Sequence, residues 1–326
     1  FVGGETRREY QKVVKQLGSA GIGAILDNSV EGGGDEIGFE ETKNAVLQTI
    51  QQAGSDENIP CACMKMTGIV AEFLLEKMTA GEILSKKDEL AWKRLEQRLT
   101  DICQLALERD TPIYIDAEES WIQGVVDELA EEMMLTFNKK RAIVFTTLQM
   151  YRTDRIDYFK GLVQKARREN VMLGVKIVRG AYMEQERERA RQRGYPSPIH
   201  PDKTASDRAF DEALRLFMDH MDVVEICVGT HNETSCRLLT NLMATRGIPN
   251  DHPHVCFSQL FGMSDHISYK LAHAGYNVTK YLPFGPVAST LPYLARRAEE
   301  NTAIAGQMSK ELEIIVKERQ RRKAAV

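Results

Sequence analysis

The segment Ala142–Val178 reads AIVFTTLQMYRTDRIDYFKGLVQKARRENVMLGVKIV and contains one complete β-α-β unit. Apolar, β-branched runs at Ala142–Thr147 and Val171–Val178 predict two strands, and the amphipathic stretch Arg155–Glu169 between them predicts a helix. Two consecutive strands joined by such a helix run parallel, with a right-handed crossover. The segment therefore predicts an α/β fold with a parallel sheet.

The same alternation continues on both sides of this unit. Further strands are expected at Ile22–Asp27, Cys61–Thr67, Pro112–Asp116, Val223–Gly229, Val255–Gln259 and Val278–Leu282. Further helices are expected at Glu40–Gln52, Glu89–Glu108, Ile122–Phe137, Thr204–His220, Glu233–Thr245, Ser264–Ala274 and Val287–Asn301. Eight strands alternating with eight helices predict a closed, TIM-like (βα)8 barrel rather than an open sheet. No flexible linker interrupts the chain, so we expect a single domain over residues 1–326, with residues 302–326 as a C-terminal helical tail.

The composition argues against several classes of function. The chain has 43 basic and 47 acidic residues, which is not the basic excess of a nucleic-acid-binding domain. It has no run of about 18 apolar residues that could span a membrane. The cysteines form no C-x-x-C pair and His252-Pro253-His254 lacks a third ligand, so we expect reduced thiols and no metal site. Because the chain begins at Phe1 rather than Met, we expect the natural N-terminus to precede it.

Polar residues gather where the expected strands end, which is where barrel enzymes carry their chemistry. They are Asp27, Glu31, Lys65, Asp116, Glu118, Thr146, Gln149, Lys176, Arg179, Thr230, His231, Asn232, Ser258, Gln259 and Tyr281. Lys65 interrupts an apolar strand, and a buried charge needs a partner. It either serves a site or forms a structural ion pair with Asp27 or Asp116, and His231 either binds a ligand or is a satisfied structural histidine.

The last expected helix carries Tyr293, Arg296, Arg297 and Glu300 on one face, at helical spacing. This pattern fits either recognition of a carboxylate or phosphate by paired guanidinium groups, or a solvated ladder of ion pairs. Neither the G-x-G-x-x-G dinucleotide motif nor the phosphate-binding P-loop occurs. A nucleotide cofactor would therefore have to be held by strand-end cations and backbone amides.

An ordered set of motifs resembles the proline dehydrogenase (proline oxidase) family over almost the whole chain. The motifs are Tyr114-Ile-Asp-Ala-Glu-Glu-Ser120, Gly174-Val-Lys-Ile-Val-Arg-Gly-Ala-Tyr182, Thr230-His-Asn232, Gln259-Leu-Phe-Gly-Met263, Lys280-Tyr-Leu-Pro-Phe-Gly285 and Tyr293-Leu-Ala-Arg-Arg-Ala-Glu-Glu-Asn301. The resemblance implies a distorted (βα)8 barrel that binds FAD without a Rossmann domain. The chain looks like a compact, single-function member of that family.

The resemblance also implies roles around the substrate. Lys65, Arg296 and Arg297 would hold the carboxylate of L-proline. Asp116 and Glu300 would orient these cations and the substrate nitrogen, with Asp116 and Lys176 as the catalytic residues. The pyrrolidine ring would be walled by Tyr182, Leu260, Tyr281 and Tyr293, and Glu31 would pair with Arg296 and close the site. Tyr281 favours proline, because hydroxyproline-preferring relatives often have a smaller residue there.

For FAD, the resemblance implies a second set of contacts. Lys176 matches a cation near flavin N5, Ala117 and Thr146 would line the isoalloxazine, and the turn Val178, Arg179, Gly180 and Ala181 would bind the cofactor. Thr230, His231 and Asn232 would lie near the pyrophosphate. The motif match leaves open which of Thr146, Gln149 and Gln259 reaches the flavin edge.

The implied reaction is oxidation of L-proline to Δ1-pyrroline-5-carboxylate, with electrons passed to a membrane quinone. It would take place in the bacterial cytoplasm at the inner face of the membrane, or at the matrix side of the mitochondrial inner membrane. The basic tail Lys317–Lys323 is either a solvated helix or a peripheral membrane contact. The alternatives are a hydroxyproline dehydrogenase, a Schiff-base aldolase using Lys65 or Lys176, and a non-catalytic scaffold.

Overall fold

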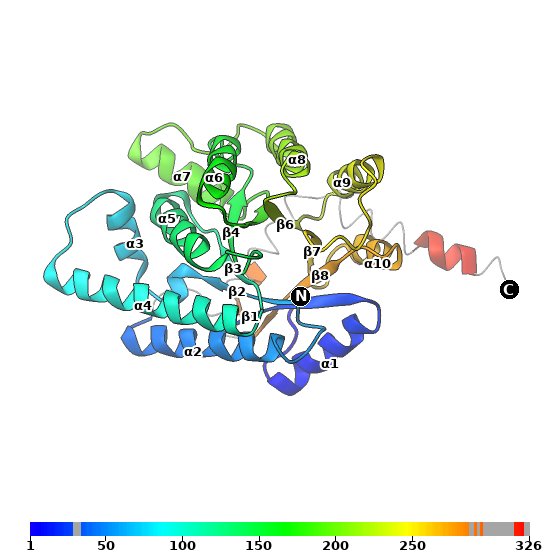
Figure 1. Cartoon of the computed structure of the whole chain (residues 1–326), viewed down its shortest axis with the longest axis horizontal. Helices are drawn as coiled ribbons and strands as arrows, with labels where there is room; N and C mark the ends of the chain where they lie inside the picture. Colours follow the sequence, from blue (N-terminus) through cyan, green and yellow to red (C-terminus); the bar gives the residue numbers. More distant parts are fainter. Residues whose placement is uncertain (29–33, 287–289, 292–293, 296–315, 323–326) are drawn as a thin grey trace.

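Eight parallel strands close into a barrel in chain order, with β8 paired to β1 (Figure 1). The structure is a computed structural model, and it describes residues 1–28, 34–286, 290–291, 294–295 and 316–322. The strands are β1 (Ile22–Asn28), β2 (Cys61–Lys65), β3 (Ile113–Asp116), β4 (Val144–Gln149), β5 (Leu173–Val178), β6 (Val224–Gly229), β7 (Val255–Leu260) and β8 (Val278–Phe284). The closed (βα)8 barrel expected from the sequence is confirmed.

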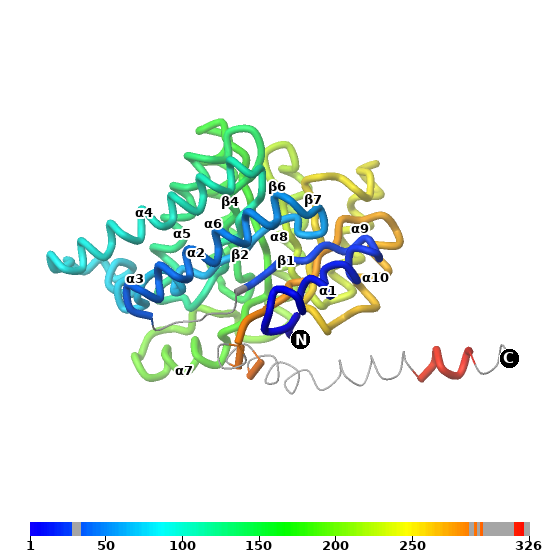
Figure 2. The backbone as a smooth tube through the Cα atoms, turned by 90° about the horizontal axis from the view of Figure 1, so that it is seen from below, coloured from blue at the N-terminus to red at the C-terminus, as the bar shows by residue number. Residues whose placement is uncertain are grey.

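Helices cover the outside of the barrel (Figures 1 and 2). They are α1 (Arg7–Gly18), α2 (Glu36–Ala53), α3 (Glu72–Thr79), α4 (Lys86–Glu108), α5 (Ser120–Phe137), α6 (Arg155–Glu169), α7 (Met183–Arg193), α8 (Lys203–Asp219), α9 (Glu233–Thr245) and α10 (Asp265–His273). The expected helix Val287–Asn301 lies mostly outside the described residues, although residues 290–291 and 294–295 are helical, as are residues 316–322 of the tail. No described helix is long and apolar enough to cross a membrane.

Three of these helices, α1, α3 and α7, were not expected from the sequence. In α1 a signal was present, since Tyr10, Val14 and Leu17 recur at helical spacing and are buried. In α7 there was none, because the segment MEQERERARQR has almost no apolar residues and buries only Glu186 and Ala190. The expected strand Cys61–Thr67 was two residues too long, because the chain turns into a short 3₁₀ helix at Met66–Gly68.

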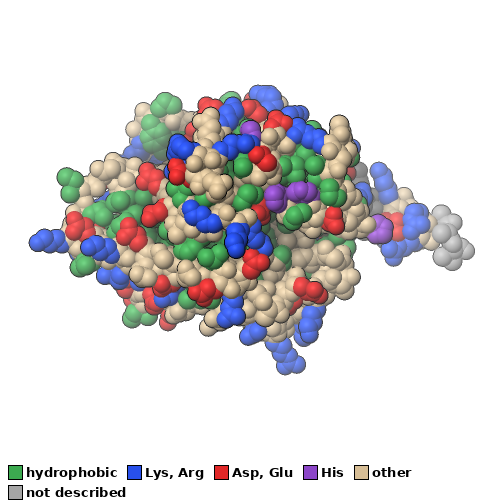
Figure 3. Space-filling model, in the orientation of Figure 1, with side chains coloured by type: hydrophobic (Ala, Val, Ile, Leu, Met, Phe, Trp, Pro, Cys, Tyr) green, Lys and Arg blue, Asp and Glu red, His purple; other side chains and the backbone are tan. Residues whose placement is uncertain are grey.

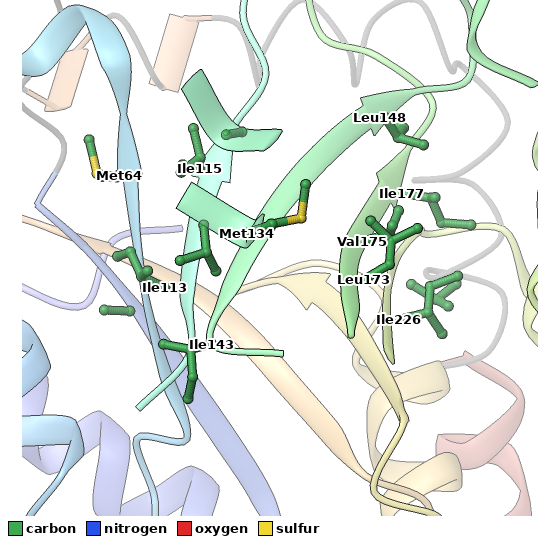
Figure 4. Close-up of a cluster of buried hydrophobic side chains, with 14 of the residues drawn as sticks. Met64, Ile113, Ile115, Met134, Ile143, Leu148, Leu173, Val175, Ile177 and Ile226 are labelled. Carbon is green, nitrogen blue, oxygen red and sulfur yellow. The ribbon is translucent and has the colours of Figure 1, made fainter. Parts of the chain in front are cut away.

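Each strand presents alternate side chains to two different cores, since successive residues of a strand point to opposite faces. The larger core lies between the strands and the helices, and Figure 4 shows Ile115, Val175 and Ile226 of the wall in it with Met134 of α5. The smaller core fills the barrel interior and consists of Ile25, Cys61, Cys63, Tyr114, Ala142, Phe145, Cys227 and Tyr281. Burial of a large apolar side chain contributes roughly 1.5–3 kcal/mol, so both cores stabilise the wall between them.

Hydrogen bonds hold the loops at the mouth of the barrel, which is the end at which the strands finish. The Asp35 carboxylate accepts the Ile37 and Gly38 amides at the start of α2. The N-terminal segment joins the end of β8, because the Gly3 amide donates to the Pro283 carbonyl at 2.8 Å. Acidic and basic side chains are interspersed on the face seen in Figure 3, which agrees with the near-balanced charge of the chain.

Candidate active site

The strand register brings charged side chains from several strands to the interior at the mouth. Lys65 of β2 pairs in register with Asp116 of β3, and Thr147 of β4 pairs with Lys176 of β5. Register partners on neighbouring parallel strands project to the same face of the sheet. Asp116 shares that face with Tyr114 of the interior core, two residues earlier on its strand. Lys65, Asp116, Thr147 and Lys176 therefore all face the inside of the barrel.

Lys176, Asp116 and Tyr281 form a connected, buried group at the centre of this mouth. The Lys176 ammonium donates to Asp116 Oδ1 at 2.5 Å, and the Tyr281 hydroxyl donates to Asp116 Oδ2 at 3.0 Å. Lys176 Nζ also lies 5.0 Å from the centre of the Tyr281 ring. All three residues are at most 8% exposed. Both carboxylate oxygens of Asp116 are thus engaged, and one polar unit joins β3, β5 and β8.

The Lys176 ammonium is held in its charged form. Burial alone would lower the pKa of Lys176, but the Asp116 carboxylate, with smaller contributions from Cys63 and Cys227, turns the net shift upward. A lysine must lose its proton to act as a nucleophile. The arrangement therefore makes Lys176 a fixed cation and disfavours it as a Schiff-base lysine. Asp116 has Lys176 as its ion-pair partner, where the sequence had suggested Lys65 as one possibility.

The position of Thr146 on β4 corrects the expectation that this residue would line the isoalloxazine. Thr146 pairs in register with Val175, which belongs to the helix-facing core, so its side chain faces the helices. Thr147 faces the interior instead, and its hydroxyl is buried with no hydrogen-bond partner in the described part of the chain. Leu148 belongs to the helix-facing core, so the alternation along β4 places Thr146 on that side and Thr147 on the other.

The two candidate glutamines both hold loops in place. Gln149 donates to the Glu118 carbonyl at 2.6 Å and accepts from the Ala181 amide at 3.2 Å, so it ties together the loops after β3 and β5. Gln259 donates to the Thr230 carbonyl at 3.1 Å and accepts from Ser268 of α10 at 2.8 Å. Its side chain therefore lies toward α10 rather than in the barrel interior.

The turn after β5 requires glycine at position 180. Gly180 has φ +137°, and a Cβ there would come within 2.5 Å of the Tyr151 ring. L side chains rarely adopt this backbone conformation, and the ring leaves them no room. Tyr182 follows at the start of α7 and is buried. The turn thus has no side chain at position 180, where its backbone packs against the Tyr151 ring.

Arg179 connects this turn to α8 and to the start of α9. Its guanidinium donates to Asp207 at 2.6 Å, to the Thr230 hydroxyl at 2.6 Å and to the Ser235 hydroxyl at 3.0 Å. Asn232 caps α9 by accepting the Thr234 amide. A helix N-terminus beside a cation suits an anion such as a phosphate. His231 lies next to this corner, with Nδ1 3.0 Å from the Ser264 hydroxyl.

Apolar side chains border the polar centre. Leu260 at the end of β7 and Leu294 both pack against the interior core that contains Tyr281. Leu294 belongs to the segment on which the sequence analysis placed its arginine pair, so the described part of that segment reaches the mouth. Glu31, Tyr293, Arg296, Arg297 and Glu300 lie outside the described residues. Ala117 directly follows Asp116 and is partly exposed.

The rim beside β3 carries Glu118, which was expected among the polar residues at the strand ends, and two further acidic residues, Glu119 and Glu186, which were not. The buried Glu118 accepts the Thr67 hydroxyl at 2.6 Å, and Glu186 accepts both the amide and the hydroxyl of Ser120 at 2.6 Å. Burial, reinforced by the neighbouring acidic groups, raises the pKa of Glu119 to about 7. Glu119 therefore changes charge near neutral pH at the edge of the site.

Comparisons with known proteins find a matching family model and several relatives. A family model described as proline dehydrogenase matches residues 10–310. The chain is 32% identical over 322 residues to the carbapenem antibiotics biosynthesis protein CarD of Pectobacterium carotovorum, with 99% of this chain and 83% of that protein covered. It is 33% identical over 323 residues to the mitochondrial proline dehydrogenase 1 of Caenorhabditis elegans, where the match covers 98% of this chain but 52% of the relative.

Among solved structures, proline utilization A from Bdellovibrio bacteriovorus, inactivated by N-propargylglycine, has the same fold. It superposes with a TM-score of 0.80 at 20% sequence identity, over 93% of this chain and 32% of that protein. This likeness concerns the barrel alone. The chain thus spans about half of the nematode relative and about a third of the bacterial structure.

Proposed function

The chain belongs to the proline dehydrogenase family, and on this premise we propose that it oxidises L-proline to Δ1-pyrroline-5-carboxylate, with FAD as cofactor and a membrane quinone as electron acceptor. The observation that carries the proposal is the buried group of Lys176, Asp116 and Tyr281 at the barrel mouth. It supplies a fixed cation and an anchored carboxylate on the face that Lys65 shares.

The residues at the mouth fit a flavin dinucleotide. The buried Thr147 hydroxyl is available as a hydrogen-bonding group beside the Lys176 cation, its register partner on β5. Arg179 and the start of α9 offer the positive end that a pyrophosphate needs. In this proposal Thr147 replaces Thr146 at the isoalloxazine, with Lys176, Ala117 and Gln149 around it. Bound FAD would supply the acceptor for the hydride that leaves C5 of proline.

The protein's own part in the reaction is to bind, orient and exclude water. Lys65 would neutralise and hold the substrate carboxylate, together with Arg296 and Arg297, and Glu300 and Glu31 would complete that cluster. Two-electron oxidation removes hydride from C5 and a proton from the ring nitrogen, so the nitrogen must lose its proton. A cationic pocket lowers the pKa of a bound amine and favours this loss. Correct orientation can lower the barrier by roughly 7–11 kcal/mol at best.

Tyr281 supports proline over hydroxyproline as the substrate. Tyr281 is 8% exposed and its hydroxyl is committed to Asp116, so it fills the space beside the proposed ring site, which Tyr182 and Leu260 would also border. We expect kcat/KM for L-proline to exceed that for trans-4-hydroxy-L-proline. The comparison of Tyr281→Ser with the unchanged protein tests this, because a smaller residue should bring the kcat/KM values for the two substrates closer together.

The decisive experiment is a visible absorption spectrum of the purified protein followed by anaerobic addition of L-proline. We expect flavin bands that bleach with proline and return on addition of a soluble ubiquinone analogue. The variant Arg297→Met should keep the bands while its KM for proline rises strongly. A protein that cannot be loaded with FAD, or a substrate adduct trapped by borohydride on Lys65, would refute the oxidase.

The basic tail is a weaker candidate for membrane contact than its charge suggests. Within residues 316–322, Glu318 forms ion pairs with Arg321 at 2.8 Å and with Arg322 at 2.9 Å. These pairs neutralise part of the basic charge that an anionic membrane would attract. Co-sedimentation with vesicles should depend on anionic lipid content if the tail binds membranes, and a lack of dependence removes the idea.

A further inference from the structure

Side chains from two neighbouring helices hold Arg179, the residue that directly follows β5. Helices α8 and α9 lie beside each other on the outside of the barrel (Figure 1). The guanidinium Nε donates to Asp207 of α8, and the two terminal nitrogens donate to the hydroxyls of Thr230 and Ser235. The centre of the fully buried Phe210 ring lies 4.4 Å from the guanidinium carbon. All three nitrogens and one face of the guanidinium group are therefore engaged.

The residues that α8 contributes lie on one face of that helix. Asp207, Phe210 and Asp211 are spaced at i, i+3 and i+4. Asp211 accepts the Ser235 hydroxyl at 2.6 Å, and a hydroxyl that donates in this way can still accept from Arg179. Helix α8 thus holds the guanidinium group directly through Asp207 and indirectly through Ser235.

Asp207 holds two cations with one carboxylate. Its Oδ1 accepts from Arg179 and its Oδ2 pairs with Lys203, both at 2.6 Å. Burial alone would raise the pKa of Asp207, but the hydrogen bonds from Lys203 and Arg179 turn the net shift downward. The carboxylate is therefore ionised at neutral pH, and the three groups together keep an excess of positive charge.

The held guanidinium group still has donors for a ligand. A guanidinium group has five N–H donors, and within the described residues these contacts use three of them. Each terminal nitrogen keeps one further N–H, and the Arg179 side chain is 22% exposed. A planar fork of this kind binds phosphate oxygens well only when its orientation matches them.

We propose that Asp207, supported by Asp211 through Ser235, is a positioning residue that sets the orientation of the Arg179 fork toward the pyrophosphate of FAD. This inference rests on the proposed function, in which Arg179 meets that pyrophosphate. Asp207 does not itself touch the cofactor, because its negative charge would repel a phosphate. Helix α8 then contributes to the preference of the site for a phosphate-bearing flavin.

The test is the variant Asp207→Ala, titrated in its flavin-free form with FAD and with riboflavin. The two ligands share the isoalloxazine and the ribityl chain, but riboflavin has no phosphate. We expect the Kd of FAD to rise about tenfold, the usual size of a hydrogen bond to a charged group. The Kd of riboflavin should stay within about twofold, because no phosphate contact is lost. Quenching of flavin fluorescence measures both constants.

A conservative variant separates orientation from charge. Asp207→Asn keeps an oxygen that can accept from Arg179 and removes the negative charge, so the Kd of FAD should return to within about threefold of the unchanged protein. In an Arg179→Met background, Asp207→Ala should add no further loss of FAD affinity, because the group that it positions is gone.

Asp219→Ala serves as the matched control. Asp219 also belongs to α8 and pairs with Arg246, directly after α9, at 2.5 Å. It links the same two helices at their other ends, so its loss should leave both dissociation constants unchanged. If Asp207→Ala fails to fold, Ser235→Ala breaks the indirect link and should raise the Kd of FAD about two- to threefold, with riboflavin unaffected.

Several outcomes would overturn the inference. They are equal losses for FAD and riboflavin, tighter binding of FAD by Asp207→Ala, a loss in Asp207→Asn as large as in Asp207→Ala, and a full additional loss in the Arg179→Met background. The unchanged protein is measured first. If it binds FAD and oxidises proline while the Asp207 variants bind FAD normally, the inference alone fails. If it does not bind FAD, the proposed function fails.

Discussion

Lys176 and Lys280 are both buried lysines in strands of the barrel, yet they lie on opposite faces of its wall. Lys176 faces the interior, where it pairs with Asp116 beside Tyr281. Lys280 faces the helices, where it donates to the Met263 carbonyl at 2.6 Å and pairs with Asp265 of α10 at 2.8 Å. Burial of a charge therefore does not by itself mark a functional site. The face of the barrel wall on which the buried charge lies does mark a functional site, because the strand ends converge in the interior at the mouth.

The strongest test of this comparison is Lys176→Met. It leaves the Asp116 carboxylate buried without its ion pair, so we expect the free energy of unfolding to fall by about 3–5 kcal/mol and proline turnover to be lost. Chemical denaturation and a turnover assay measure the two effects. Normal turnover in a folded Lys176→Met protein would contradict the assignment of Lys176 to the site.

Lys280→Met is the matched change on the helix side. Its ion-pair partner Asp265 is 63% exposed and stays solvated, so the expected loss is that of hydrogen bonds to the loop, about 1–3 kcal/mol. We expect kcat/KM for proline to stay within about threefold of normal. A loss of turnover as large as that of Lys176→Met would show that the two faces do not divide structure from function.

Glu119 extends the comparison to the rim, where a half-buried carboxyl group lies among other acids. Because its pKa is raised to about 7 from an ordinary 4.5, the folded chain binds a proton that the unfolded chain releases between these values. The free energy of unfolding should therefore fall as pH rises from about 4.5 to about 7 and level off above, by about 1–2 kcal/mol after solvent screening. The variant Glu119→Gln should lose this dependence, as measured by denaturation at a series of pH values. An unaltered pH profile in that variant would assign the dependence to another group.

The smallest expected effect compares the neighbours Thr147 and Thr146. Thr147→Val removes a buried hydroxyl that faces the interior, and we expect FAD affinity to fall about threefold, at the low end for one hydrogen bond. Thr146→Val changes the helix-facing side and should leave FAD affinity unchanged. Quenching of flavin fluorescence measures both dissociation constants. The reverse order of effects would restore Thr146 as the flavin contact.

Much of the fold was predictable because the periodicity of apolar residues is a local property. The helices at Arg155–Glu169 and Glu233–Thr245 have the boundaries that the pattern predicted. The strands were displaced by one or two residues where a turn or a 3₁₀ helix takes over, as at Met66–Gly68. Helix α7 escaped detection because its charged residues carry no apolar period, and its position depends on contacts such as that between Glu186 and Ser120.

Which residues belong to the candidate site could be predicted from the sequence, but how they are arranged could be predicted less well. Lys176, Asp116 and Tyr281 were all named from motifs, but their mutual hydrogen bonds join residues 60 and 165 positions apart in the chain. Gln259 was named for the flavin edge, yet Ser268 and Thr230 hold its side chain on the helix side. Motifs identify residue types, whereas the face of a side chain depends on strand register.

Local patterns in the chain were sufficient for the barrel, for the family, and for the set of polar residues at the strand ends. Only the folded chain decided how they are arranged: that Lys176 rather than Lys65 pairs with Asp116, and that Thr147 rather than Thr146 faces inward. The physical reason is that a one-residue change of register moves a strand side chain to the other face. Pairing between distant strands sets that register, and no local pattern carries it.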